Sequence, residues 1–149
     1  KTEELCATIM SETSITEYQN CIICENHIPN EYIDINQSLF CRAIINLFEN
    51  AYSARRGDAD FCILFTVRKE ITNGEEKVCF CIKDNGLGVS KENLPKLKEI
   101  GYTTNGSSGL GLPFVYKVVK QMDGDIFLES TEGVGTKISI FLPKGDQYE

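Results

Sequence analysis

The sequence predicts an α+β fold, a two-layer α/β sandwich in which helices pack on a mostly antiparallel sheet. Runs of alternating apolar and polar residues occur in pairs joined by turn sequences, as in antiparallel hairpins. Longer segments have apolar residues at helical spacing. The strand–helix–strand repeats that would indicate a parallel sheet are missing from the sequence. With 149 residues, 42% hydrophobic and 25% charged, the chain is expected to form one domain around one core.

The first third of the chain is expected to hold a short helix, short strands and a long helix. Residues 3–12 have weak helical periodicity, and residues 18–24 and 32–35 are strand candidates. Residues 37–53 are apolar on almost every side, which predicts a helix buried against the sheet.

The remainder is expected to form two hairpins with a helix between them. Alternation predicts strands over residues 61–67, 78–82, 126–130 and 136–142. Asn73-Gly74 is a hairpin turn signal between the first two strands. A short helix or loop is expected over 91–100 and a mobile polar segment over 102–108. Residues 113–122 predict a helix, with proline in its first turn, where the missing N–H costs nothing.

Charge and composition exclude some classes of partner. The net charge is −7 and no basic stripe is present, which argues against nucleic acid, since phosphate binding needs clustered Lys and Arg. No apolar run approaches the length of a membrane span, so the domain itself is not expected to contact a membrane. We expect it in the cytoplasm.

Seven cysteines are present, an odd number that fits a disulfide framework poorly. Cys21 and Cys24 lie in a strand candidate, where positions three apart point to opposite faces and cannot share one ion without a bend. Free cysteine is among the most buried residue types, so we expect reduced packing residues.

Two asparagines, Asn46 and Asn50, lie four residues apart on the predicted helix 37–53 and therefore share a face. An unpartnered buried amide costs about 1–3 kcal/mol, so a pair of satisfied structural amides is one interpretation. The other is a site, because an Asn carbonyl suits Mg²⁺ that keeps water and phosphate oxygens.

Asp84 ends a predicted strand and precedes Gly86 and Gly88. A turn is the simplest interpretation of such a sequence. An ionised carboxylate only accepts hydrogen bonds, so Asp84 can also accept the amino hydrogen of adenine and would repel the carbonyl oxygen of guanine. The two glycines permit a close backbone approach that a Cβ would block.

A glycine-rich segment, residues 106–112, opens the predicted helix 113–122. Backbone N–H groups at a helix N-terminus attract anions, so Gly109, Leu110 and Gly111 are suited to hold a triphosphate.

The order and spacing of these three motifs, over residues 34–143, resemble the nucleotide site of the GHKL ATPase superfamily, which includes gyrase B, Hsp90, histidine kinases and MutL. The chain is most similar to the catalytic and ATP-binding domain of a sensor histidine kinase. The resemblance implies a Bergerat-type ATP-binding fold with ATP and Mg²⁺ as cofactors. It assigns the metal to Asn50 and the adenine to Asp84.

The same resemblance implies further site residues. The nucleotide-binding set is Asn46, Asn50, Asp84, Gly86, Gly88, Thr103, Thr104, Gly109, Leu110, Gly111 and Leu112. The catalytic candidates are Asn46 and Glu49. Asn46 stands where hydrolysing members carry a water-activating Glu, and an amide is a poor base, which fits a kinase better than an ATPase. Glu49 is either a helper near the phosphates or a solvated edge residue.

The chain departs from the family pattern at two positions. Ser53 and Asn105 stand where many histidine kinases have lysines that meet phosphate oxygens. Arg55, Arg56 and Lys117 are not in register to replace them. Since charge stabilisation dominates phosphoryl transfer, nucleotide binding is a safer expectation than strong catalysis.

The resemblance implies transfer of the γ-phosphoryl group of Mg-ATP to a histidine on a separate dimerisation domain, with a response regulator as downstream partner. His27 lacks the helical acidic context of a phosphoacceptor, so the acceptor is expected outside this chain. Residues 1–20 are expected to be a remnant of an upstream dimerisation helix and linker, and residues 21–149 the ATP-binding domain. Two alternatives stay open: a serine kinase of the anti-sigma-factor type, and a nucleotide-binding regulatory module without catalysis.

Overall fold

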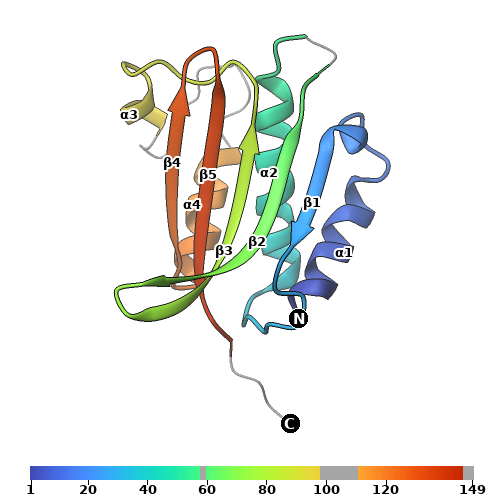
Figure 1. Ribbon diagram of the computed structural model, residues 1–149, viewed down its shortest axis with the longest axis vertical. Helices are drawn as coiled ribbons and strands as arrows, with labels where there is room; N and C mark the ends of the chain where they lie inside the picture. The colour runs from blue at the N-terminus through green and yellow to red at the C-terminus, as the bar shows by residue number, and fades with distance from the viewer. Residues whose placement is uncertain (58–59, 98–110, 146–149) are drawn as a thin grey trace.

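The computed structural model describes residues 1–57, 60–97 and 111–145 (Figure 1). Its elements are α1 (Thr2–Thr13), the 3₁₀ turn η1 (Gln19–Cys21), β1 (Ile22–Asn26), α2 (Gln37–Ser53), β2 (Ile63–Thr72), β3 (Glu75–Asp84), α3 (Leu94–Leu97), α4 (Gly111–Gln121), β4 (Asp125–Thr131) and β5 (Gly135–Pro143).

The strands form one sheet in the order β1-β2-β3-β5-β4. β1 pairs in parallel with β2, and every other pair is antiparallel. Figure 1 shows α1, α2 and α4 covering one face of this sheet, with α2 between the other two. The predicted two-layer sandwich with a mostly antiparallel sheet is confirmed.

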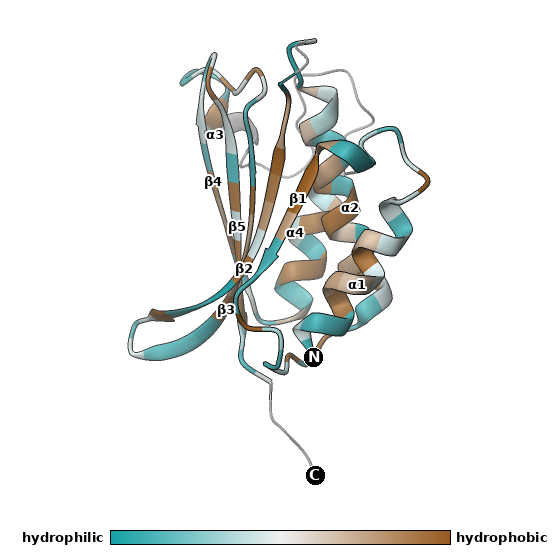
Figure 2. Cartoon of the chain, turned by 45° about the vertical axis from the view of Figure 1, so that its right-hand side comes forward, coloured by the Kyte–Doolittle hydropathy of each residue, from teal (hydrophilic) through white to brown (hydrophobic). Residues whose placement is uncertain are grey.

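The β2–β3 hairpin turns where the sequence predicts. Asn73 and Gly74 both have positive φ, 52° and 80°, as a tight primed turn requires. Both strands run further toward this turn than the apolar alternation predicts. Their ends near the turn are mostly polar and extend beyond the core, so the alternation does not mark them as strand. Figure 2 shows this hydrophilic end of the hairpin projecting from the sheet.

The predicted helix 37–53 is confirmed at both ends as α2. Asn36 caps it, since its side-chain oxygen accepts the Leu39 N–H at 3.2 Å. The α2 side chains that pack into the core are Phe40, Cys41, Ala43, Ile44, Leu47, Phe48 and Ala51. Edge-to-face ring contacts join Phe40 to Phe80 and Phe48 to Phe65.

Helix α1 belongs to the same core, because Leu5 and Ile9 are buried against it. The backbone N–H of Thr2 donates to the Glu31 carbonyl at 2.9 Å, which fixes the start of the helix beside the segment after β1. The division of the chain at residue 20 stays a prediction.

Several predicted boundaries differ from the structure. No strand forms over 32–35, where Ile33 and Ile35 pack partly buried against the core and the Tyr32 carbonyl accepts the Gly145 N–H. The strand predicted over 18–24 begins only at Ile22, because the preceding residues form η1. Both strand predictions came from runs of apolar residues. Such runs indicate that a segment is buried, but they do not show that its backbone pairs with another strand. α4 begins two residues before Pro113, and the short helix predicted within 91–100 is α3.

Among the described residues, no helix is both long and apolar enough to cross a bilayer. The predicted mobile segment 102–108 lies outside them.

Candidate functional site

β3 and α2 end on the same side of the domain, and α4 begins on that side (Figure 1). β3 ends at Asp84, which is buried with 9% of its surface exposed. Its Oδ1 accepts the Gly86 N–H at 2.8 Å and the Thr136 N–H at 3.3 Å. Burial raises the pKa of the Asp84 carboxyl, and the two N–H groups partly oppose this rise. The carboxylate is thus fixed through one oxygen.

The loop after Asp84 lies against the end of α2. The Leu87 N–H donates to the Ala54 carbonyl at 2.7 Å. A Cβ on Gly86 would lie 2.6 Å from the same carbonyl oxygen, so only glycine allows this approach. The packing of the fold itself therefore requires glycine at Gly86, the first of the two glycines predicted for the site.

The same loop lies against the β4–β5 turn. Gly88 has φ +70°, and a Cβ there would lie 2.1 Å from the Thr131 carbonyl oxygen. The Gly133 N–H donates to the Leu87 carbonyl at 2.7 Å, and the Val89 N–H donates to Ser130 Oγ at 2.8 Å. The sequence predicted this turn only as a connection, but it forms one wall of the Asp84 loop.

Asn85 holds the loop from the other side, a role that the sequence analysis did not assign. Its Oδ1 accepts the Cys62 N–H at 2.8 Å, and its Nδ2 donates to the Asp60 carbonyl at 2.9 Å. The only sequence signal is its position next to Asp84.

Asn46 and Asn50 are half-buried on α2. Tyr52 packs on Tyr18 with ring centroids 5.7 Å apart, which marks the face of α2 turned toward α1. Asn50 precedes Tyr52 by two residues and so lies roughly 200° around the helix, on the side of α4. Arg42, whose guanidinium lies 5.3 Å from the Phe114 ring of α4, continues this side toward the start of α2.

Glu49 is exposed and lies on the side of Tyr18. Burial raises the pKa of the Tyr18 hydroxyl, and the nearby Glu49 carboxylate raises it further. Glu49 and Asn50 therefore face different directions, although they are adjacent in the sequence.

The arginines near the site contact protein groups. The Arg55 guanidinium lies 3.8 Å from the Tyr52 ring centroid and donates to the Tyr52 carbonyl at 2.8 Å. Arg56 donates to the Gly133 carbonyl at 2.9 Å and to the Asn85 carbonyl at 3.4 Å. Arg56 thus joins the loop after α2 to the Asp84 loop and to the β4–β5 turn. Ser53, at one of the two positions where a lysine was expected, is the exposed last residue of α2.

The glycine-rich part of the predicted site is described only at its end. Gly111 begins α4, and the Leu112 side chain packs partly buried against the core. The predicted residues Thr103, Thr104, Gly109 and Leu110 lie outside the described residues, as does Asn105.

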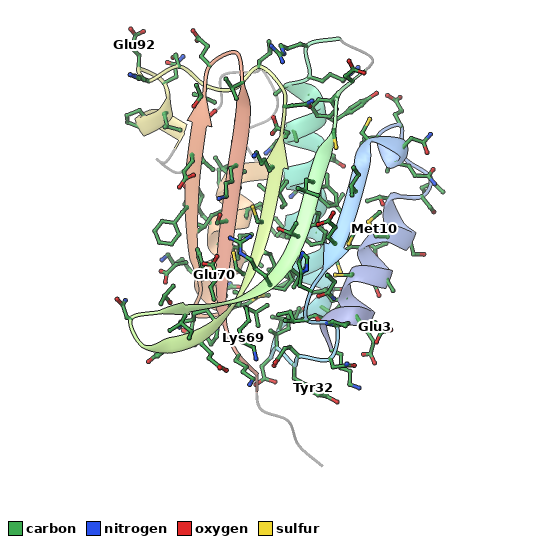
Figure 3. All side chains as sticks on the ribbon, in the orientation of Figure 1. Glu3, Met10, Tyr32, Lys69, Glu70 and Glu92 are labelled. Atoms are coloured by element: carbon green, nitrogen blue, oxygen red, sulfur yellow. The ribbon has the colours of Figure 1, made fainter. Side chains whose placement is uncertain are left out.

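His27 follows β1 and is exposed, with Nε2 3.7 Å from a Glu25 carboxylate oxygen. It lines an open hollow with Tyr32 and Lys144. Figure 3 shows Tyr32 at the end of the molecule opposite Glu92, which lies near α3 on the side of the Asp84 loop. His27 thus lies at the other end of the domain from the Asp84 loop.

Comparison with known proteins gives one family. Residues 35–146 match the family model described as histidine kinase-, DNA gyrase B-, and HSP90-like ATPase. Sensor histidine kinase WalK of Bacillus subtilis is 30% identical over 127 residues, which cover 79% of this chain and 20% of that protein. Sensor protein RprX of Bacteroides fragilis is 31% identical over 136 residues, 87% of this chain and 25% of that protein. The chain thus spans a quarter or less of the length of these relatives.

Solved structures share the fold. The catalytic domain of histidine kinase ThkA superposes with a TM-score of 0.76 at 22% identity, covering 95% of this chain and 91% of that one. Full-length ShkA in complex with AMPPNP superposes with a TM-score of 0.78 at 20% identity, covering 100% of this chain and 31% of that one.

Proposed function

The chain belongs to the family of histidine kinase-, DNA gyrase B- and HSP90-like ATPases, and from this membership we propose that it is the ATP-binding catalytic domain of a sensor histidine kinase. It would bind Mg-ATP and transfer the γ-phosphoryl group to a histidine on a separate dimerisation domain of the same kinase. A response regulator would then receive the phosphoryl group. The domain would work in the cytoplasm, free or as part of a membrane-bound sensor.

The observation that carries the proposal is the fixed carboxylate of Asp84. Both of its hydrogen bonds from the described residues go to Oδ1. Oδ2 is then available to accept the amino hydrogen of adenine. The buried position strengthens such a bond, because water competes poorly there. Gly86 and Gly88 let the loop backbone lie close enough to the α2 end and the β4–β5 turn to form a rigid base site.

The phosphate end of the proposed site lies between α2 and α4. The N-terminus of α4 favours negative charge, and Gly109, Leu110 and Gly111 lead into it. Asn50, on the α4 side of α2, would hold Mg²⁺, which would neutralise charge on the phosphate oxygens. Asn46, one turn earlier, is an amide and cannot deprotonate water, which supports phosphoryl transfer over rapid hydrolysis.

One set of contacts favours weak catalysis, and hence a second candidate, a nucleotide-binding regulatory module. The guanidinium groups of Arg55 and Arg56 bind protein carbonyls, and Ser53 brings no charge. We expect transfer to be slow if it occurs. Adding the dimerisation helices in trans separates the candidates, since only a kinase forms acid-labile phosphohistidine on them.

Titration calorimetry with ATP and GTP tests the base site. The wild-type chain should prefer ATP by at least about tenfold, which corresponds to about 1.4 kcal/mol. Asp84→Asn should reduce this preference, because an amide can also donate to the guanine carbonyl oxygen. Asp125→Asn, at an exposed aspartate of β4, is the control and should keep the preference. Equal affinities of the wild-type chain for ATP and GTP would contradict the assignment of Asp84.

A further inference from the structure

Two thiols outside the nucleotide site lie together where α1 packs beside β1. Figure 1 shows these elements side by side at one edge of the domain. Asn26, at the end of β1, donates from Nδ2 to the Thr2 hydroxyl oxygen at 3.2 Å. Thr2 also donates this hydroxyl to the Ile28 carbonyl. The start of α1 is therefore fixed against the end of β1.

The spacing along both elements makes cysteines the next facing pair. Cys6 lies four residues after Thr2 on the same face of α1, a rise of about 6 Å. Cys24 lies two residues before Asn26 on the same face of β1, a rise of about 6.7 Å. Because the two elements run in opposite directions, these equal steps place the two thiols opposite each other. The Cys6 and Cys24 side chains are indeed close enough for each thiol to shift the pKa of the other.

The two thiols have unequal environments. Cys6 is buried with 7% of its surface exposed, whereas Cys24 is half-buried. The Cys6 side chain lowers the pKa of the Cys24 thiol, and burial opposes this effect. The pKa of Cys6 is raised by the neighbouring Cys24 side chain and by burial. Cys24 is thus the thiol that ionises first and that a reagent reaches first.

We propose that Cys6 and Cys24 are a modification site that forms a reversible disulfide by exchange with a low-molecular-weight disulfide. The Cys24 thiolate attacks one sulfur of the reagent, breaks its S–S bond and releases one thiolate. That thiolate takes up a proton and leaves as a thiol. Cys6 then loses its proton to solvent and attacks the Cys24 sulfur, which forms the protein disulfide and releases the second thiol. The two protein thiols are oxidised, and the reagent is reduced to two thiols.

The surrounding thiols explain why this pair is selected. Cys41, on α2, is buried, and burial raises its pKa to about 11. Cys79 is buried on β3, and burial raises its pKa to about 12. Cys21 and Cys62 are half-buried like Cys24, which makes them the matched controls. The new bond would close the chain between positions 6 and 24 and connect α1 covalently to the sheet.

The test treats the folded 149-residue chain with oxidised glutathione, blocks the remaining thiols by alkylation, and maps the disulfides by mass spectrometry without reduction. We expect a Cys6–Cys24 linked peptide as the main product, reversed by dithiothreitol. Cys24→Ser should abolish the linked peptide, and no other cysteine should then carry glutathione in comparable yield. Cys21→Ser and Cys62→Ser should leave the yield of the linked peptide unchanged. The oxidised wild-type chain should melt at a higher temperature than the reduced chain, and Cys24→Ser should show no such difference.

Other outcomes would overturn the proposal. These are a main product linking Cys24 to Cys21 or Cys6 to Cys41, a disulfide between two chains, or no intramolecular disulfide while circular dichroism shows a folded chain. Because Cys6 is buried and Cys6→Ser could unfold the domain, alkylation rates on the wild-type chain give a second measurement. Iodoacetamide should modify Cys24 faster than Cys21 and Cys62, and an equal or slower rate would also refute the pairing.

Discussion

Replacing Gly88 with alanine should damage both the stability of the domain and its nucleotide site, and Gly133→Ala measures how much of this comes from backbone conformation alone. Gly88 has φ +70° and Gly133 has φ +80°, so each alanine is placed in the left-handed region. That strain costs about 1–2 kcal/mol at either position. A Cβ on Gly133 meets nothing within 4 Å, so this strain should be nearly its whole cost.

Gly88→Ala adds a collision that Gly133→Ala lacks. The added Cβ would lie 2.1 Å from the Thr131 carbonyl oxygen, and the β4–β5 turn must withdraw by 0.9 Å to give even a 3.0 Å contact. The hydrogen bonds from Gly133 to Leu87 and from Val89 to Ser130 join the same two segments, the Asp84 loop and the β4–β5 hairpin. Losing both costs about 2 kcal/mol net. The sum for Gly88→Ala is thus about 3–4 kcal/mol, against about 1–2 kcal/mol for Gly133→Ala.

Urea unfolding followed by circular dichroism gives the free energies, and calorimetry at a temperature where both variants are folded gives the ATP affinity. At roughly 3 °C per kcal/mol for a chain of this size, Gly88→Ala should melt about 10 °C below wild type and Gly133→Ala about 3–6 °C below it. Only Gly88→Ala should weaken ATP binding strongly. Equal losses of stability in the two variants, or wild-type ATP affinity in Gly88→Ala, would refute the packing argument.

Three further predictions concern the proposed site. Asn50→Ala should weaken Mg-ATP binding by at least about tenfold and metal-free adenosine binding by much less, and equal losses in calorimetry would mean that Asn50 is only structural. Because burial raises the pKa of Asp84 in the folded state, ionising it costs stability. The neutral Asp84 carboxyl therefore stabilises the folded wild-type chain at acid pH, and this stabilisation is lost as pH rises through the raised pKa. Over the same rise, urea unfolding should show the free energy of unfolding of Asp84→Asn increasing relative to that of wild type. ATP binding should weaken as pH falls through that pKa. Finally, the chain alone should neither hydrolyse ATP quickly nor label itself from radioactive ATP; acid-labile label that disappears in His27→Ala would place the phosphoacceptor in this chain.

Sequence periodicity predicted those elements whose burial follows one regular pattern. The bounds of helix α2 were predicted correctly from its apolar residues, and the structure adds the Asn36 cap at its start. The prediction of a strand over 32–35 was wrong because burial there does not follow strand pairing. The two isoleucines are partly buried in a connection that pairs with no strand. The parallel pairing of β1 with β2 left no local signal, since it depends on where α2 returns the chain.

The glycines of the Asp84 motif could be predicted from the sequence, but their partners could not. Gly86 and Gly88 are restricted by carbonyl groups of Ala54 and Thr131, which lie more than thirty positions away in the chain. Asn85 and Arg56 are ordinary polar residues in the sequence, and only the fold brings their side chains to the backbone of neighbouring loops. The same holds for Cys6 and Cys24, whose proximity depends on the packing of α1 against β1.

The order in which the sheet can assemble follows from its register. In the β2–β3 and β4–β5 hairpins, pairing can begin at residues three or four positions apart, Thr72 with Glu75 and Thr131 with Gly135. The seam between the hairpins, β3 with β5, joins residues at least 54 positions apart, Lys83 with Lys137. Contacts of such separation are slow to form, because a long loop must close first. The Asp84 bond to Thr136 crosses this seam, so the proposed base site can form only after the two hairpins have docked. A nucleotide bound across the seam should therefore act mainly by slowing the unfolding of the domain, with little effect on its folding rate.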